Sequence, residues 1–277
     1  MLFRVFFNSE RKLRNGWWIA IFLGVLALIL FPAILTARRF GLTLSMLDQA
    51  WIILAATWAC QFMRKKPVAE VIGRFNGRWV KDLLLGGLIG SSLMLVPALF
   101  LLAGGWVNWQ WSNASASVIF SGLLLMAAVA AAEELLFRGF MFQRLIAGTG
   151  PWLAQLLMGA LFLLTHIDNP GMIGSAKLWA SANIFLASVL FGLAFLRTGR
   201  LALPIGIHFM ANVAQGTILG FGVSGNTEAG LLVPHYFKNA PDWLTGGAFG
   251  LEASAPGLVC ILIGVVLFHR ASPTRGH

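Results

Sequence analysis

Charged side chains and cysteines are scarce in this sequence of 277 residues. Charged residues make up 11% of the chain and acidic residues number only 10, whereas 58% of the residues are hydrophobic. This composition excludes a soluble domain as the simplest interpretation and predicts a polytopic membrane protein. The two cysteines, Cys60 and Cys260, stand alone inside apolar segments. Their isolation fits neither a disulfide framework nor a metal cluster.

Long apolar segments predict an all-α, polytopic integral membrane protein with about eight transmembrane helices. The apolar windows lie at about 17–36, 42–63, 83–104, 117–137, 152–166, 178–196, 201–221 and 256–269. The first window follows a basic stretch, as in a signal peptide, but no small-residue cleavage site follows it. We therefore expect this segment to remain as an anchor. No internal repeat or linker divides the chain, which predicts a single membrane domain over residues 1–277.

The basic residues predict how the chain is oriented in the bilayer. If the amino terminus is cytoplasmic, sixteen of the 20 Lys and Arg residues lie on that side. The opposite side keeps only Arg38, Arg39, Lys177 and Lys238. This asymmetry predicts that both termini are cytoplasmic, in agreement with an even number of spans. With no organelle signal in the chain, we expect the bacterial inner (plasma) membrane.

The net charge of +10 follows from the same orientation. Basic residues at the cytoplasmic face are attracted to the anionic lipid of the bilayer, which is the partner that this charge predicts. No nucleic-acid partner is expected.

Two adjacent glutamates, Glu133 and Glu134, lie inside one of the most apolar stretches of the chain. Ionisable groups at membrane depth are costly and usually functional. Glu134 and Arg138 are four residues apart, so they face each other on a helix and are expected to form an ion pair. Glu133 is rotated by about 100° from Glu134 and has no such local partner. It is therefore predicted to be free to accept or donate a proton.

Two of the five histidines lie within apolar windows. His166 follows Phe162 by four residues, and His208 precedes Asn212 by four residues, so each pair shares one helix face. Either histidine alone could be a core residue that hydrogen-bonds a neighbouring helix. Together with the glutamates, they give three helices that each present polar groups to the interior, which favours a functional site.

A turn signal at residues 148–151 lies midway between Glu133 and His166. Straight helices on either side place both residues ~22 Å from the turn, and therefore at matching depth. We expect Glu133, His166 and His208 to converge in one cavity that opens towards the cytoplasm or the inner leaflet.

The ordered set of motifs resembles the CAAX protease and bacteriocin-processing (CPBP) group, intramembrane endopeptidases similar to the type II CAAX prenyl endopeptidases. The motifs are Glu-Glu-x-x-x-Arg at 133–138, Phe-x-x-x-His at 162–166 and His-x-x-x-Asn at 208–212. The resemblance implies a catalytic core at about 117–221. It also implies hydrolysis of a peptide bond in a hydrophobic peptide or membrane-protein substrate, either of CAAX type or in the processing of a bacteriocin or leader peptide.

The resemblance implies catalytic roles for four residues. Glu133, helped by His166, activates a water for attack on the peptide carbonyl, while His208 and Asn212 stabilise the oxyanion. General chemistry agrees, because a side-chain donor to an oxyanion is typically worth ~3 kcal/mol. A carboxylate removed from water also binds a proton more readily and so suits a general base.

Glu134, Arg138 and Phe162 are the supporting residues of this interpretation. The Glu134–Arg138 pair fixes the helix face and prevents Glu134 from competing for the proton. Arg138 has an alternative role, which is to bind the terminal carboxylate of the substrate.

The same side chains could instead hold zinc, with Glu133, His166 and His208 as ligands, since two histidines and a glutamate form a known catalytic set. The sequence lacks His-Glu-x-x-His, which excludes the common zincin arrangement. We expect no obligatory metal cofactor, and zinc is the alternative. Two other classes compete with the protease: a non-catalytic membrane protein of bacteriocin immunity type on the same scaffold, and a proton-coupled transporter. The absence of an inverted repeat argues against the transporter.

Three further features are interpreted as structural. Trp106, Trp109 and Trp111 lie in an uncharged loop and predict an aromatic belt at the outer interface. The segment 222–255 is rich in glycine and proline and predicts short interfacial helices or a re-entrant cap. Ser224 stands in a Gly-x-Ser-Gly match to rhomboid serine proteases, but no histidine follows on a suitably placed apolar helix. A flexible turn is expected there.

Overall fold

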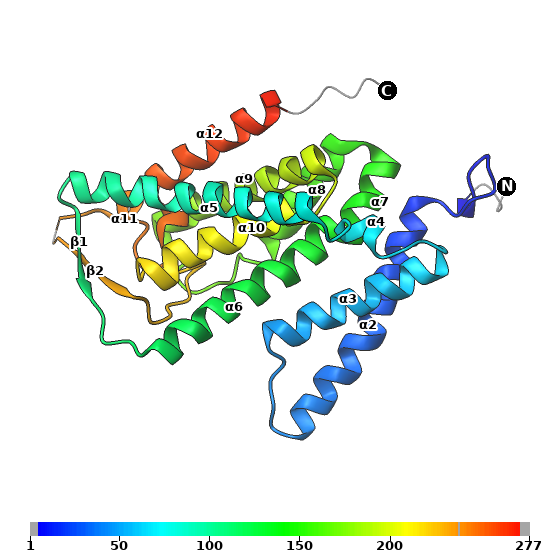
Figure 1. Ribbon diagram of the computed structural model, residues 1–277, viewed down its shortest axis with the longest axis horizontal. Coiled ribbons are helices and arrows are strands. Elements are labelled where there is room, and N and C mark those ends of the chain that lie inside the picture. The colour runs from blue at the N-terminus through cyan, green and yellow to red at the C-terminus, as the bar shows by residue number, and fades with distance from the viewer. Residues whose placement is uncertain (1–4, 238, 272–277) are drawn as a thin grey trace.

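The computed structural model describes residues 5–237 and 239–271 and is mostly helical (Figure 1). Lys238, which entered the orientation argument, lies outside the described residues. The elements are α2 (Asn15–Arg39), α3 (Met46–Met63), α4 (Ala69–Ile72), α5 (Gly77–Ala103), β1 (Val107–Trp111), α6 (Ala116–Glu134), η1 (Leu135–Gly139), α7 (Phe140–Thr149), α8 (Pro151–Leu164), α9 (Gly174–Thr198), α10 (Ala202–Asn212), η2 (Val213–Ile218), β2 (Leu232–Tyr236), α11 (Asp242–Thr245), η3 (Leu251–Ala253) and α12 (Ala255–Ala271).

Every apolar window of the sequence falls on a helix. In the described part of the chain, 4 helices are long and apolar enough to cross a membrane: α2, α5, α6 with its continuation through α7, and α9. Helices α8 and α12 are apolar but shorter. The described N-terminal end of the chain lies towards the end of the molecule opposite the β1–β2 sheet (Figure 1).

A small antiparallel sheet corrects the all-α prediction. Strand β1 pairs with β2, with Val107 opposite Tyr236 and Trp111 opposite Leu232. The indole N–H of Trp109 donates to the Leu219 carbonyl oxygen at 2.9 Å, so this ring supports the strand pair. Alternating aromatic residues suit a strand. The partner strand β2 lies more than a hundred residues away in the sequence, so no local pattern predicts the pairing.

Helices α5 and α10 pack closely because glycines line their contact. A Cβ on Gly90 would overlap the Ile207 carbonyl oxygen, and a Cβ on Gly206 would overlap the Leu83 carbonyl oxygen. Small residues allow helix backbones in a membrane to approach one another. Because α10 also contains His208, this contact fixes the depth and rotation of the third motif.

The other helices pack around this pair. Helix α9 contacts α8, α10 and α12, while the α2–α3 pair packs against α6 and α7 (Figure 1). Buried apolar side chains form two large clusters, one around α2, α3, α7 and α8 and one around α5, α9, α10 and α12. Cys60 is fully buried in the first cluster, as a small core residue, and both cysteines are free.

Gly90→Ala is expected to lower the thermal unfolding midpoint, because the added methyl meets a backbone carbonyl and overpacking typically costs about 1–3 kcal/mol. The matched control is Gly24→Ala in α2, where nothing lies within 4 Å of an added Cβ. That variant should keep or raise the midpoint, since alanine favours the helix. Thermal unfolding of the purified proteins in detergent measures both, and equal midpoints would contradict the packing argument.

Candidate functional site

The three motifs meet at one cavity of about 580 Å³. Its lining includes Glu133 from α6, Phe162 and His166 at the end of α8, and His208 and Asn212 from α10. Glu133 Oε2 lies 3.8 Å from His208 Nε2, so the predicted convergence of these two side chains is confirmed. The catalytic roles assigned to the residues stay predictions.

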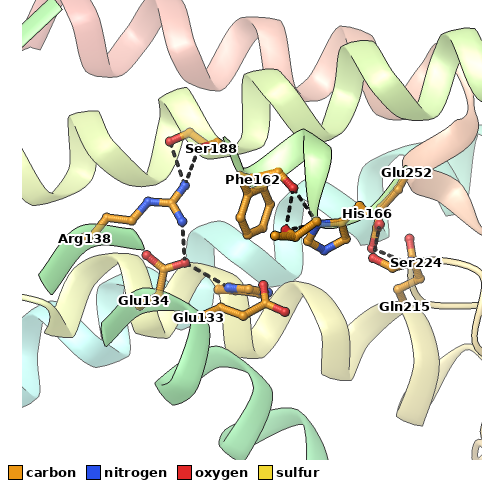
Figure 2. A network of polar contacts seen from close by, with 11 residues as sticks. Glu133, Glu134, Arg138, Phe162, His166, Ser188, Gln215, Ser224 and Glu252 are labelled. Atoms are coloured by element: carbon orange, nitrogen blue, oxygen red, sulfur yellow. Dashed lines mark hydrogen bonds and ion pairs between the residues drawn. The ribbon is translucent and has the colours of Figure 1, made fainter. Parts of the chain in front are cut away.

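Arg138 is held entirely inside the protein. Its Nη1 lies 3.3 Å from Glu134 Oε1, with side-chain exposures of 1% and 0%, which confirms the predicted pair. Its Nη2 donates to the Ser188 carbonyl oxygen at 2.9 Å and to the Ser188 hydroxyl at 2.7 Å (Figure 2). The rings of Phe162 and Phe191 lie 5.0 and 5.1 Å from the guanidinium carbon. Arg138 is not among the lining residues of the cavity, which argues against the alternative that it binds a substrate carboxylate, and its role stays a prediction.

Glu134 has a second partner that the sequence did not reveal. His208 Nδ1 lies 3.0 Å from Glu134 Oε1, and because the carboxylate accepts, Nδ1 carries the proton. The other ring nitrogen, Nε2, is then the one that faces Glu133. The ring of Phe191 stacks on the imidazole, with centroids 4.9 Å apart and planes 12° apart. His208 is thus oriented from α6 on one side and from α9 on the other.

Glu133 differs from its neighbour in being partly exposed and in making no hydrogen bond through its Oε2 atom. Its side chain is 19% exposed. Its Oε2 is buried and makes no hydrogen bond within the described part of the chain. An unpaired carboxylate oxygen beside an imidazole is the arrangement that a general base requires.

His166 is fixed by the backbone of its own helix end. Its Nδ1 lies 2.7 Å from the Phe162 carbonyl oxygen, which can only accept, so Nδ1 is the donor. The Phe162 ring lies 4.5 Å from the imidazole, centroid to centroid. In the neutral ring the Nε2 lone pair is therefore left to accept a hydrogen bond, for example from a water in the cavity.

Two motif helices continue as π-helical turns immediately after their motif residues. η1 follows Glu134 and contains Arg138, and η2 follows Asn212. Such turns are rare and frequently occur at functional sites. Sequence periodicity did not predict either of them.

The donor atoms do not fit a three-ligand zinc site. Among residues 5–237 and 239–271, no group of three His, Cys, Asp or Glu side chains is arranged to hold one metal ion. The Nδ1 atoms of His208 and His166 are engaged by Glu134 and by the Phe162 carbonyl, so only the Nε2 atoms remain as possible metal donors. Water activation at this site is therefore assigned to the side chains of the protein.

The cavity extends to residues that sequence analysis missed. The Ser224 hydroxyl donates to Glu252 Oε2 at 2.9 Å, and Gln215 Nε2 donates to Glu252 Oε1 at 2.9 Å (Figure 2). Burial raises the pKa of the Glu252 carboxyl above its usual range. The turn at Ser224, which was expected to be flexible, belongs to the cavity wall and has a left-handed backbone with φ of 49°. One signal in the sequence could have identified this part of the cavity, because Glu252 is an acid within a largely uncharged segment.

The exposed lining residues are Thr165, Asn226 and Glu228. The orientation of the chain in the bilayer is a prediction, so the expected opening towards the cytoplasm or inner leaflet stays a prediction as well. Helix α8 ends at Leu164 after 14 residues. A helix of that length does not complete a crossing, and His166 follows directly where it stops.

Comparison with known proteins identifies the segment that contains the site. Residues 114–214 match the family described as type II CAAX prenyl endopeptidase Rce1-like. This segment is similar to that family. It includes all three motifs, so the predicted resemblance is confirmed over these residues. The match is to a protease family, and with the four long apolar helices it indicates an integral membrane protein.

The chain is also similar to a bacterial protein, the uncharacterized protein YyaK of Bacillus subtilis (strain 168). The two are 27% identical over 186 residues, which cover 65% of this chain and 62% of the relative. The chain thus spans about three fifths of the length of the curated relative it matches.

Glu134→Gln is expected to destabilise the protein by about 3–5 kcal/mol, because it leaves a buried guanidinium without its countercharge. It also weakens the acceptor for His208 Nδ1. The control is Lys12→Gln, which breaks a shorter pair of 2.7 Å with Glu10 whose side chains are 75% and 66% exposed. That change should have no measurable effect, because solvent screens such pairs. Chemical unfolding in detergent measures both, and similar losses would contradict the assigned importance of burial.

Proposed function

We propose that this protein is an intramembrane endopeptidase that hydrolyses a peptide bond of a hydrophobic or membrane-associated substrate with a water activated by Glu133. One observation carries the proposal: Glu133 presents an unpartnered carboxylate oxygen 3.8 Å from His208 Nε2, in a cavity also lined by His166 and Asn212. The Rce1-like match of the same segment supports it.

The first step is the activation of water. Glu133 accepts a proton from a water molecule while the water oxygen attacks the carbonyl carbon of the substrate. The lone pair on His166 Nε2 accepts the second hydrogen of that water and holds its oxygen towards the carbonyl. The C=O π electrons move onto the carbonyl oxygen, which becomes an oxyanion.

The oxyanion needs hydrogen-bond donors, and His208 and Asn212 provide them. With Nδ1 already donating to Glu134, a ring that also donates from Nε2 is an imidazolium, and the carboxylate of Glu134 stabilises that charge. Removing one such donor typically costs ~3 kcal/mol of transition-state stabilisation. Glu134 is a positioning residue in this scheme, since it acts through His208.

Collapse of the tetrahedral intermediate completes the reaction. The oxyanion electrons restore the C=O bond, the C–N bond breaks, and the proton held by Glu133 passes to the leaving amine nitrogen. The products are a carboxylic acid and an amine, and Glu133 returns to its ionised form. CAAX-type processing and processing of a bacteriocin or leader peptide in a bacterial inner membrane are the substrate settings that we propose.

Glu133→Gln is expected to lower cleavage by at least about a hundredfold, because the amide cannot accept the proton of the attacking water. Its unfolding midpoint should be unchanged, unlike that of Glu134→Gln. Asp168→Asn is the control, since Asp168 is an exposed acid that does not line the cavity. Release of fluorescence from a library of apolar quenched peptides in detergent micelles measures the rates. Undiminished cleavage by Glu133→Gln would rule out the mechanism, and binding without cleavage by the unmodified protein would favour the non-catalytic scaffold.

Exhaustive treatment with a membrane-permeant chelator is expected to leave most of the cleavage intact, because the base and the oxyanion donors belong to the chain itself. Metal content and activity are measured on the same sample before and after treatment. Stoichiometric zinc, with activity lost on stripping and restored on adding zinc back, would overturn this expectation and recast Glu133, His166 and His208 as ligands.

A further inference from the structure

We propose that Arg64 and Arg144 form a binding site for the phosphate group of an anionic phospholipid, between helices α2, α3 and α7. The site lies away from the cavity, and neither arginine belongs to the three sequence motifs. The inference concerns a lipid ligand and does not depend on the proposed endopeptidase function.

The two arginines come from distant parts of the sequence and share one acid. Arg64 directly follows α3, and its Nη2 lies 3.4 Å from Glu70 Oε1. Arg144 belongs to α7, and its Nη2 lies 3.9 Å from the same oxygen atom. Two positive charges therefore meet one negative charge, and the cluster of three side chains keeps a net positive charge.

Arg144 is poorly satisfied by its contacts within the protein. Its Nη1 donates to Asn15 Oδ1 at 3.5 Å, and its contact with Glu70 is longer still. A good hydrogen bond from a guanidinium to an anion is about 2.7–2.9 Å long. Only 16% of the Arg144 side chain is exposed, so few water molecules can replace the missing acceptors. Arg64 also repels Arg144. A bound anion would supply short acceptors and reduce this repulsion.

Arg200, at the same end of the molecule, shows the contrast with a satisfied pair. Its side chain packs against Gly73, directly after α4. Its Nε donates to Asp82 Oδ2 at 2.7 Å, and its Nη2 lies 2.6 Å from the same atom. One cation and one anion are matched there at short distances. The long contacts of Arg144 are therefore not a general property of the partly buried arginines.

Phe140 forms an apolar floor beneath the two arginines. Its ring is fully buried, and the guanidinium carbons of Arg64 and Arg144 each lie 5.8 Å from its centre. Low polarity strengthens the attraction between opposite charges. A planar guanidinium held over a ring presents its N–H groups in fixed directions, which suits the oxygen atoms of a phosphate.

The surface beside the site suits a phospholipid better than free phosphate. Helix α2 begins at Asn15, and Phe22 is its one buried residue in the described part of the chain. Acyl chains can therefore lie along its exposed apolar side chains while the phosphate reaches Arg144. The start of α2, α4 and α7 lie at the same end of the molecule (Figure 1). The predicted orientation puts this end at the cytoplasmic leaflet, where basic pockets between helices bind anionic headgroups.

The test is a titration of delipidated protein in detergent with phosphatidylglycerol, in which native mass spectrometry gives the apparent Kd of the first bound lipid. Phosphatidylglycerol is expected to bind about tenfold more tightly than zwitterionic phosphatidylcholine. Arg144→Gln should weaken this binding about fivefold, the typical contribution of one basic residue at a headgroup. Arg144→Lys should recover only part of the loss, because the ammonium keeps the charge but lacks the planar fork.

The matched control is Arg74→Gln, at an exposed arginine four residues after Glu70, and it should leave the Kd unchanged. Equal affinities for the two lipids, or an equal loss in Arg74→Gln and Arg144→Gln, would overturn the site. Inorganic phosphate is added as a competitor in the same detergent. Displacement of the lipid by an equal concentration of phosphate would overturn the phospholipid as the occupant and identify a site for free phosphate.

Glu70→Gln separates a ligand site from a purely structural cluster, and it also serves if Arg144→Gln does not fold. In a phosphate site Glu70 competes with the ligand for both arginines, so its neutralisation should tighten phosphatidylglycerol binding about fivefold. In a purely structural cluster the same change only loosens the contact between α3, α4 and α7. Unchanged or weaker lipid binding by Glu70→Gln would therefore overturn the proposal.

Discussion

The buried carboxylate of Glu134 is the contact on which the arrangement of the site depends. It accepts from Arg138 and from His208, and Arg138 in turn donates to Ser188, so one network joins α6, η1, α9 and α10 (Figure 2). A charge buried in a membrane protein is stable only when every partner is present. The helices therefore cannot rotate or slide independently, and His208 is held with one defined nitrogen towards the cavity.

The two adjacent glutamates have different surroundings because successive residues of a helix are rotated by about 100°. Glu134 faces the interior of the bundle, where its side chain is fully buried, while Glu133 faces the cavity with a side-chain exposure of 19%. Oε1 of Glu134 accepts from Arg138 and from His208, whereas Oε2 of Glu133 lies beside His208 Nε2 in the cavity without a hydrogen bond. The same residue type thus gives a structural anion and a candidate base. The two side chains differ in the direction, around the helix axis, that each one faces.

Spacing within a helix predicted much of the site, and contacts between helices limited the prediction. The Glu134–Arg138 pair and the helical windows depend on local periodicity, and the structure contains them. The bond from His208 to Glu134 depends on the rotation of α10, which the glycine contact with α5 sets and no local pattern reports. The same limit hid the β1–β2 sheet and the roles of Ser188, Phe191 and Glu252, whose partners are distant in sequence.

Unsatisfied polar atoms show where the fold has been shaped for something other than its own stability. In the described part of the chain the buried side-chain atoms without a partner are Glu133 Oε2, Glu134 Oε2, Asn183 Nδ2 and Gln215 Oε1. Glu133 and Asn183 line the cavity, and the other two residues bond directly to side chains that line it. Packing errors would scatter through both apolar clusters, whereas these atoms gather around one cavity. Since a buried unpaired group lowers stability, their concentration there indicates that molecules in the cavity, water among them, supply the missing partners.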